Sequence, residues 1–491
     1  MNRKLLRSVR EYKRESILTP LLVVMEVFME VLIPLLMANI IDIGIMNGDM
    51  GYIVKTGLLL ILLAMVALVF GAKAGNLGAI ASAGYAKNLR HDIFYKIQDF
   101  SFGNIDHFST SGLVTRLTTD ITNVQMAYMF TIRLLVRAPI MIVLSLIMTL
   151  TINVKVAVMM LITIPILGGT LIFIAKKAHP HFIKVFDEYD ILNNTVQENV
   201  NAARVVKAYV RADHENEKFG KISTIVYNLF TKAEKIVAWN NPVMMFTMYV
   251  VVLVMVYIGG EDIVFGRMQT GELTSVIVYA IQILMSLMMV SFVFVMIMIA
   301  EASSDRIKEV LDEVPEMEDR ADALTEVPSG DIDFENVSFS YAGEGGNLSL
   351  KDVDLHIKSG QIVGIIGGTG SAKSTLVQLI PRLYDVTKGT VKVGGHDVRD
   401  YSLKALRDQV SVVLQKNVLF TGTISDNIRW GDESASDEEV QRVCKLAQAD
   451  GFIQEFPGKY DTMIVEGGNN VSGGQKQRLC IAGLCSRNRR S

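Results

Sequence analysis

Long apolar runs occupy the first three hundred positions of the chain, whereas the remaining residues mix polar and apolar positions as a water-soluble domain does. A helix needs about 20 mostly apolar residues to cross the hydrocarbon core of a bilayer. On this criterion the sequence predicts six membrane-spanning helices, over residues 17–45, 56–72, 138–154, 156–175, 236–260 and 273–300. Only Lys155 separates the third span from the fourth, so we expect a tight hairpin there.

Basic residues beside the spans predict their orientation, because lysine and arginine accumulate on the cytoplasmic side. Six lie in residues 1–16, six in 73–133 and ten in 176–235, against only Lys55, Lys155 and Arg267 on the other side. The N-terminus, both long loops and the C-terminal region are therefore expected in the cytoplasm. Helical spacing over 78–99 and 182–235 indicates that the membrane helices continue beyond the bilayer. Residues 1–16 are expected to form a basic amphipathic segment on the inner leaflet, with an ordinary charged flank as the alternative.

Two carboxylates interrupt the first span. Glu26 and Glu30 lie one helical turn apart, and a charge at this depth usually faces a water-filled cavity or a partner group. They are candidates for attracting a cationic substrate. The alternative is that they pair with a polar group on a neighbouring helix or are protonated.

Composition narrows the class of protein further. Hydrophobic residues make up 50% of the chain and charged residues 20%, which excludes both a purely soluble and a disordered protein. The formal net charge is −3, so nothing points to a nucleic-acid partner. Three cysteines in the soluble region, without a CxxC pair, are expected to be reduced thiols.

The C-terminal region carries a phosphate-binding pattern. After a linker over 311–330, strands are predicted at 332–339 and 361–366, and the second leads into a glycine-rich turn and a helix. In such a turn the backbone N–H groups and the helix N-terminus form an anion cradle, the lysine reaches the β- and γ-phosphates, and the following hydroxyl binds Mg²⁺. The predicted ATP-binding residues are Gly367, Gly368, Thr369, Gly370, Ser371, Ala372, Lys373, Ser374 and Thr375.

Ala372 stands where the usual G-x4-G-K-[ST] pattern has its second glycine. The turn can keep its shape with alanine if this position is already helical.

Three further features follow at suitable spacings. Tyr341 ends a strand upstream of the turn, where an aromatic ring can stack on adenine. Gln415 could contact Mg²⁺ and the attacking water. The third feature is the start of a predicted helix, where small residues let backbone N–H groups approach a γ-phosphate. It consists of Ser472, Gly473, Gly474 and Gln475.

The order of these motifs resembles an ATP-binding cassette (ABC) transporter of the exporter type, in the bacterial multidrug-exporter-like group. The resemblance extends to the membrane part, where FSFGNIDHFSTSGLVTRLTTDITNV (100–124) and QENVNAARVVKAY (197–209) are similar to the family's first and second intracellular loops. It implies a six-helix transmembrane domain (17–310) fused to a C-terminal α/β P-loop nucleotide-binding domain (331–491). A half-transporter of this kind would reside in the bacterial inner membrane.

The resemblance also implies roles for these residues. Tyr341 would stack on adenine, Lys373 would bind phosphate, and Ser374 and Gln415 would bind Mg²⁺. Residues 472–475 would be the signature that closes on ATP held by a second half-transporter, so the working unit would be a dimer. Residues 426–431 (DNIRWG) favour a heterodimer. The implied function is ATP-driven export of a small molecule that the sequence does not identify.

The chain departs from the family pattern after the signature helix, because no strand ending in Asp, no catalytic Glu and no switch His follows. The residues from about Gly483 onward look out of frame, so we expect an incomplete domain, truncated or frameshifted. We also expect negligible ATP hydrolysis by this polypeptide alone. The alternatives are a non-catalytic ATP-binding partner of a heterodimeric exporter and an ATP-gated channel or regulator on the same fold.

Overall fold

The computed structural model describes residues 4–343 and 345–487, which form two compact units. Residues up to 96 together with 111–312 make up the first unit, and residues 97–110 together with those from 313 onward make up the second. The first unit ends at residue 312, and the expected linker covers residues 311–330. The segment 97–110 differs from expectation, because it groups with the C-terminal domain rather than with the spans.

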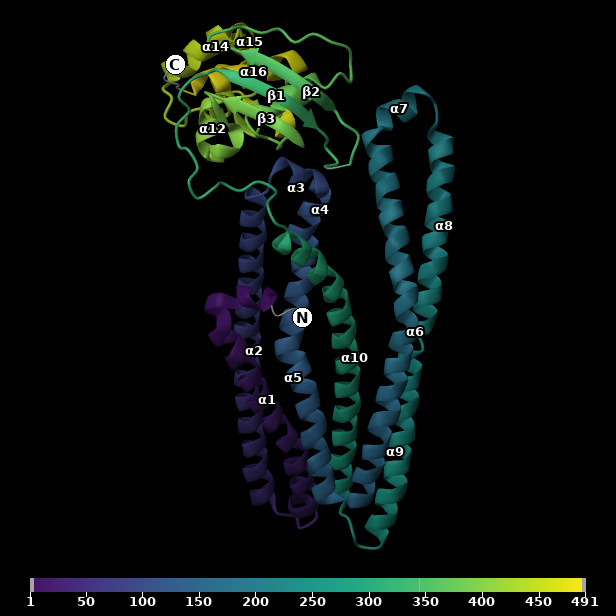
Figure 1. Cartoon of the computed structure of the whole chain (residues 1–491). Coiled ribbons are helices and arrows are strands. Elements are labelled where there is room, and N and C mark those ends of the chain that lie inside the picture. Colours follow the sequence, from purple (N-terminus) through teal and green to yellow (C-terminus); the bar gives the residue numbers. More distant parts are fainter. Residues whose placement is uncertain (1–3, 344, 488–491) are drawn as a thin grey trace. The chain divides into compact units, whose positions relative to one another are not determined.

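The first unit is entirely helical (Figure 1). Its α-helices are α1 (Lys13–Asn39), α2 (Met50–Gln98), α4 (Thr110–Thr115), α5 (Ile121–Ile152), α6 (Val154–Asn201), α7 (Ala203–Ala208), α8 (Ala212–Val237), α9 (Asn240–Val264) and α10 (Thr270–Asp312). A 3₁₀ segment (Leu5–Tyr12) precedes α1, and π-helical turns follow α1 (Ile40–Ile45) and α4 (Arg116–Asp120).

Six helical stretches in the described residues are long and apolar enough to cross a membrane, as the sequence predicts. Helices α2 and α6 extend well past their apolar segments, and the polar helix α8 leads into the apolar helix α9, as the helical spacing over 78–99 and 182–235 predicts. The α6–α7–α8 segment forms a long hairpin (Figure 1). The turn between the third and fourth spans lies at Asn153 rather than Lys155, because the Asn153 side chain accepts hydrogen bonds from the N–H groups of Lys155 and Val156 and so caps α6.

Helices α1 and α10 pack along a shared apolar and polar seam. Val23, Val27 and Val31 follow at successive turns of α1 and are buried. The hydroxyl of Tyr279 on α10 donates to the carbonyl oxygen of Val31 at 2.8 Å. At the end of the seam the Asp42 carboxylate accepts from the backbone N–H groups at the start of α10. The carboxylate satisfies N–H donors that have no partner within the helix.

The second unit combines a small antiparallel sheet with short helices. The sheet order is β2 (Leu350–Ile357), β1 (Ile332–Phe339), β3 (Lys388–Val393) and β4 (His396–Asp397), and a separate pair joins β5 (Gly422–Thr423) and β6 (Met463–Ile464). The helices are α3 (Phe102–His107), α11 (Lys373–Leu379), α12 (Leu403–Gln409), α13 (Ile424–Arg429), α14 (Asp437–Leu446), α15 (Asp450–Glu455) and α16 (Gly473–Ser486). Single 3₁₀ turns occur at Val398–Asp400, Lys459–Asp461 and Glu466–Gly468.

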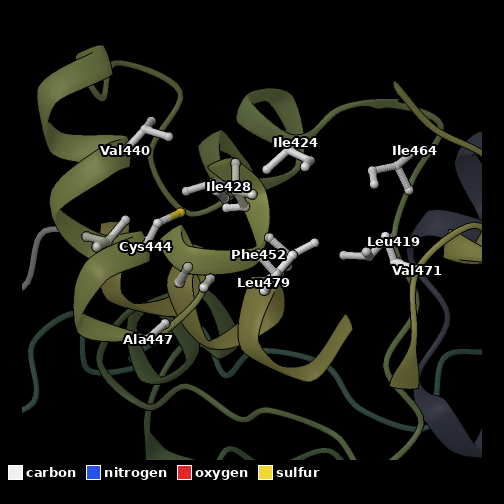
Figure 2. Packing of buried hydrophobic residues seen from close by; sticks show 14 of the residues in the cluster. Leu419, Ile424, Ile428, Val440, Cys444, Ala447, Phe452, Ile464, Val471 and Leu479 are labelled. Atoms are coloured by element: carbon white, nitrogen blue, oxygen red, sulfur yellow. The ribbon is translucent and has the colours of Figure 1, made fainter. Parts of the chain in front are cut away.

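Two apolar cores stabilise this unit. One lies under the sheet and includes Phe334, Val391 and Tyr401. The other holds helices α13–α16 together, with Ile428 and Leu479 fully buried, and is shown in Figure 2. Cys444 lies within it, and the three cysteines are free thiols, as expected.

One predicted strand is wrong and one is confirmed. Residues 332–339 form β1 with the predicted bounds. Residues 361–366 have no regular structure, and Ile362 and Ile366 are fully exposed. An apolar run of this kind forms a strand when neighbours pair with it and cover both faces, and no strand among the described residues pairs with 361–366.

The described part of the signature helix continues to Ser486, past the point where the sequence pattern changes. The Ser486 hydroxyl is buried and donates to the carbonyl oxygen of Ile428 at 3.0 Å. A Cβ on Gly431 would lie 1.9 Å from the carbonyl oxygen of Gly483, so α13 and α16 approach closely here. Residues 1–3 and 488–491, parts of the expected N-terminal segment and of the changed tail, lie outside the described residues.

Candidate nucleotide-binding site

The glycine-rich turn ends where α11 begins, at Lys373, as the motif predicts. The Lys373 ammonium group donates hydrogen bonds to the carbonyl oxygens of Gly367 at 2.9 Å and Gly368 at 2.7 Å, and to the Ser371 hydroxyl at 3.2 Å. Among the described residues no carboxylate pairs with it. A cation that has only neutral acceptors at the mouth of a helix fits an anionic ligand such as a triphosphate.

The backbone at Ala372 does not meet the condition of helical geometry under which alanine can replace glycine in this turn. Its φ is +57° and its ψ is 25°, in the left-handed region. An L-residue with a Cβ pays roughly 1–2 kcal/mol there, whereas glycine does not. The alanine is therefore accommodated with backbone strain, and the turn retains the shape that the glycine pattern encodes.

A magnesium ion at this turn would rely mainly on the nucleotide for its ligands. Ser374 is exposed beside Lys373 and offers one hydroxyl oxygen. No group of three or more His, Cys, Asp or Glu side chains gathers into a metal site anywhere in the described residues. Mg²⁺ in phosphate sites usually keeps few protein ligands and binds substrate oxygens, so the donor set present fits the ion only together with the phosphates.

Tyr341 lies beside this turn, where the sequence places it. Its hydroxyl forms hydrogen bonds with Thr375 Oγ1 at 3.0 Å and Gln378 Oε1 at 3.2 Å, both on α11. Its ring is half exposed and lines a cavity of about 660 Å³. A cavity of this size is within the range of small-molecule sites.

Tyr384 and Asp106 also line this cavity, and the sequence did not predict either of them at the site. Tyr384 follows α11, and Asp106 lies on α3. The Tyr384 hydroxyl donates to Asp106 Oδ2 at 2.8 Å. The resemblance of residues 100–124 to an intracellular loop was the only sequence signal for α3, and it did not indicate proximity to the nucleotide site.

Gln415 is exposed in a segment without regular structure. No hydrogen bond in the described residues joins it to the P-loop residues. The structure therefore leaves its predicted contact with Mg²⁺ untested.

The signature residues open α16 with a capping box. Ser472 Oγ accepts from the backbone N–H of Gln475 at 3.3 Å, and Gln475 Oε1 accepts from the N–H of Ser472 at 2.8 Å. Gly473 and Gly474 are exposed, and a Cβ on either would meet nothing within 4 Å. No hydrogen bond links this turn to the P-loop within the described chain.

The two carboxylates of the first span are paired. Arg137 on α5 donates to Glu26 Oε1 at 2.6 Å and also to Glu30 Oε2. The structure thus shows the pairing alternative, in which a neighbouring helix neutralises part of the charge. On α2, Gly71 makes room for this cluster, because a Cβ there would lie 2.9 Å from Glu26 Oε1.

Comparison with known proteins agrees with this geometry. Residues 16–287 match the family model of the ABC transporter transmembrane region, and residues 350–490 match the family model described as ABC transporter. An uncharacterized ABC transporter ATP-binding protein, YfiB of Bacillus subtilis, is 36% identical over 98% of this chain and 83% of its own length. An uncharacterized ABC transporter ATP-binding protein of Mycobacterium tuberculosis, Rv1273c, is 32% identical over 96% of this chain and 82% of its length. An ATP-dependent lipid A-core flippase of Desulfotalea psychrophila is 30% identical over 81% of this chain and 69% of its length.

Both parts of the chain therefore match the same family, and the spans and the P-loop occur in the order that its exporters have. The chain belongs to the ABC transporter family, as a multi-pass membrane half-transporter of the exporter type.

Proposed function

We propose that this half-transporter binds ATP·Mg²⁺ between its own P-loop and the signature of a second half-transporter, and that closure of this pair drives export. The observation that carries the proposal is Lys373, a cation without a carboxylate partner among the described residues, at the start of α11. Tyr341 supports it from the adenine side, and the open turn at Ser472 supports it from the partner side. Ser374 and Gln415 would contact the metal ion.

Photo-labelling of membranes with 8-azido-ATP tests nucleotide binding. We expect labelling of this chain, and loss of labelling in Lys373→Ala, because the phosphates lose their principal cation. Ser472→Ala should retain labelling of this chain and reduce nucleotide trapping in the partner. Absence of labelling in the wild-type chain, with or without a partner, would overturn the proposal.

We further propose a heterodimer in which the sister chain carries out hydrolysis. Residues 476–491 contain no Asp, Glu or His, so this segment supplies no carboxylate to polarise the attacking water. A general base of this kind contributes about 10²–10⁴ in rate. Phosphate release that depends on Lys373 in the purified polypeptide at rates typical of exporters would contradict this part of the proposal.

A non-catalytic partner role is the second candidate, and the open signature turn favours it. Such a subunit would lend Ser472 to the ATP of a complete sister chain. Transport by the pair that depends on Ser472 here and on the sister's own P-loop lysine would support this role. ATP turnover that does not respond to any transported compound would instead favour an ATP-gated channel or regulator.

The exported compound is proposed only as a class. Flippases of lipid A-core are among the relatives, which supports an amphiphilic cargo. Pairing of Glu26 and Glu30 with Arg137 leaves one negative charge in excess, so a cationic group remains compatible with the spans. Vesicle uptake with a panel of cationic and anionic amphiphiles distinguishes these classes, with Glu26→Gln and Glu30→Gln compared in parallel.

A further inference from the structure

Four aromatic rings form a cluster beside the P-loop helix, and the ring of Tyr341 belongs to it. Tyr341 meets Phe339 with 4.8 Å between ring centroids and 80° between planes, and meets Tyr384 at 5.2 Å and 86°. Tyr384 also contacts Phe339 at 5.7 Å and Phe102 of α3 at 6.0 Å. The two contacts of Tyr341 are edge-to-face, and such contacts are attractive and directional. They fix the tilt of the Tyr341 ring.

Hydrogen bonds fix the far end of the same ring. The Tyr341 hydroxyl contacts Thr375 and Gln378 on α11, while Tyr384 and Phe339 hold the ring from its sides. The orientation of Tyr341 therefore depends on three elements: β1, α11 and the segment that follows α11. Among the residues that hold the Tyr341 ring, Tyr384 also contacts α3.

Tyr384 is itself held by Asp106. Its hydroxyl donates to Asp106 Oδ2 at 2.8 Å, and burial together with this carboxylate raises the pKa of Tyr384 well above its ordinary value. The hydroxyl consequently remains a donor throughout the neutral range. Loss of either partner removes a charge-assisted hydrogen bond, which is stronger than a neutral one.

Helix α3 presents Asp106 from a rigid frame. Ser101 and Asn104 form a capping box at its start. The Asn104 side-chain amide donates to Glu313 Oε1 at 2.7 Å and to the carbonyl oxygen of Val314 at 3.0 Å. The loop 97–110 is thus joined to the start of the C-terminal segment next to the cavity that Tyr341 lines.

We propose that Tyr384 is a positioning residue for the base of the nucleotide. Tyr384 holds the ring of Tyr341 in the orientation that stacking requires. The hydrogen bond from Tyr384 to Asp106 couples this orientation to the position of α3. The inference rests on the proposed function, because it takes Tyr341 as the residue that stacks on adenine. Coupling between two sites is reciprocal. If the bound base stabilises the docked position of α3 by a given factor, displacement of α3 weakens binding of the base by the same factor.

The coupling predicts a split between base and phosphate binding. Residues of the P-loop would contact the phosphates, and no hydrogen bond in the described part of the chain joins the Tyr384 side chain to them. Equilibrium binding of radiolabelled ATP and of radiolabelled tripolyphosphate to the purified full chain in detergent separates the two contributions. We expect Tyr384→Ala to raise the Kd for ATP about three- to tenfold, the effect of losing edge-to-face contacts on a ligand-stacking ring. The Kd for tripolyphosphate should be unchanged, which also shows that the P-loop is folded.

Conservative variants test the link through Asp106. Tyr384→Phe keeps the ring and loses the hydrogen bond, and Asp106→Ala loses the same bond from the other side. Each should raise the Kd for ATP by a smaller factor, and the double variant should be no weaker than either single variant, because both remove one interaction. Hydrogen exchange in residues 97–110 should slow on addition of ATP but not of tripolyphosphate, and Tyr384→Phe should abolish this difference.

Tyr401→Phe is the matched control. Tyr401 is buried in the sheet core of the same unit, and its hydroxyl donates to the carbonyl oxygen of Val393 at 2.8 Å. Loss of the Tyr401 hydroxyl should leave the ratio of the Kd for ATP to the Kd for tripolyphosphate unchanged. Equal weakening of ATP and tripolyphosphate in Tyr384→Ala, or no weakening of either, would overturn the inference. Failure of the wild-type chain to bind both ligands would overturn the nucleotide-binding function itself, and the inference with it.

Discussion

Replacement of Arg137 by alanine tests whether the charges of the first span are held by pairing within the membrane unit. Arg137 is 21% exposed at its side chain, and its partners Glu26 and Glu30 are 17% and 35% exposed. Removing the guanidinium leaves two carboxylates without a counter-charge between α1, α2 and α5. A lone charge in this position is costly.

The magnitude follows from the two contacts. The bond to Glu26 joins groups that are mostly buried, and a hydrogen bond between charged groups is worth about 1.5–3 kcal/mol. Glu30 is more exposed, so its share is discounted to less than about 1 kcal/mol. We therefore expect Arg137→Ala to destabilise the membrane unit by about 1.5–4 kcal/mol. Glu26→Gln should cost less, because Arg137 keeps Glu30 and the amide oxygen still accepts.

Thermal inactivation in detergent, followed by the fraction of monodisperse protein that survives heating, measures this effect. Arg137→Ala should lower the midpoint by several degrees, and adding Glu26→Gln and Glu30→Gln to it should restore at least half of the loss. Arg133 lies one turn away on α5 and has no ion-pair partner among the described residues, so Arg133→Ala is the matched control with little change expected. An unchanged midpoint in Arg137→Ala, or no recovery in the triple variant, would refute the reasoning.

Three other predictions follow from single positions. Ala372→Gly should relieve about 1–2 kcal/mol of left-handed strain and give back about 0.4–1 kcal/mol of unfolded-state entropy, so the melting midpoint of the nucleotide-binding domain should rise slightly; a fall would show that the strain is absent. Gly84→Ala places a Cβ 2.3 Å from the ring of Tyr12 and should cost about 1–3 kcal/mol by overpacking, which thermal inactivation in detergent detects as a lower midpoint. Burial and the Asp106 carboxylate raise the pKa of Tyr384 in the folded state. The contribution of Tyr384 to the free energy of unfolding is therefore complete below about pH 10, and it declines above that pH because the phenol ionises in the unfolded chain. Chemical denaturation from pH 9 to 11 should therefore show a steeper loss for the wild type than for Tyr384→Phe, and parallel curves would contradict the assignment.

The sequence predicted those parts of the structure that depend on local pattern. Six spans follow from the length of apolar runs, and β1 follows from residues 332–339 with the predicted bounds. The start of α11 at Lys373 and the cap at Ser472 follow from motifs whose geometry is local.

The parts that were missed depend on distant residues. Strand formation at 361–366 requires neighbouring strands, and none among the described residues pairs with it. The partner of Glu26 and Glu30 is Arg137, which lies on a different helix and which no periodicity identifies. The left-handed backbone at Ala372 depends on the path of the whole turn, which overrides the preference of alanine.

The second unit is assembled from two pieces of chain, and this has a consequence for biosynthesis. Residues 97–110 leave the ribosome well before residue 313, yet α3 belongs with the residues that come last. Since domains generally fold as units during translation, Asp106 and Asn104 must wait without their final contacts while most of the spans are being made. A version of the C-terminal domain expressed from residue 313 onward would lack this piece, so Tyr384 would lose its acceptor in it.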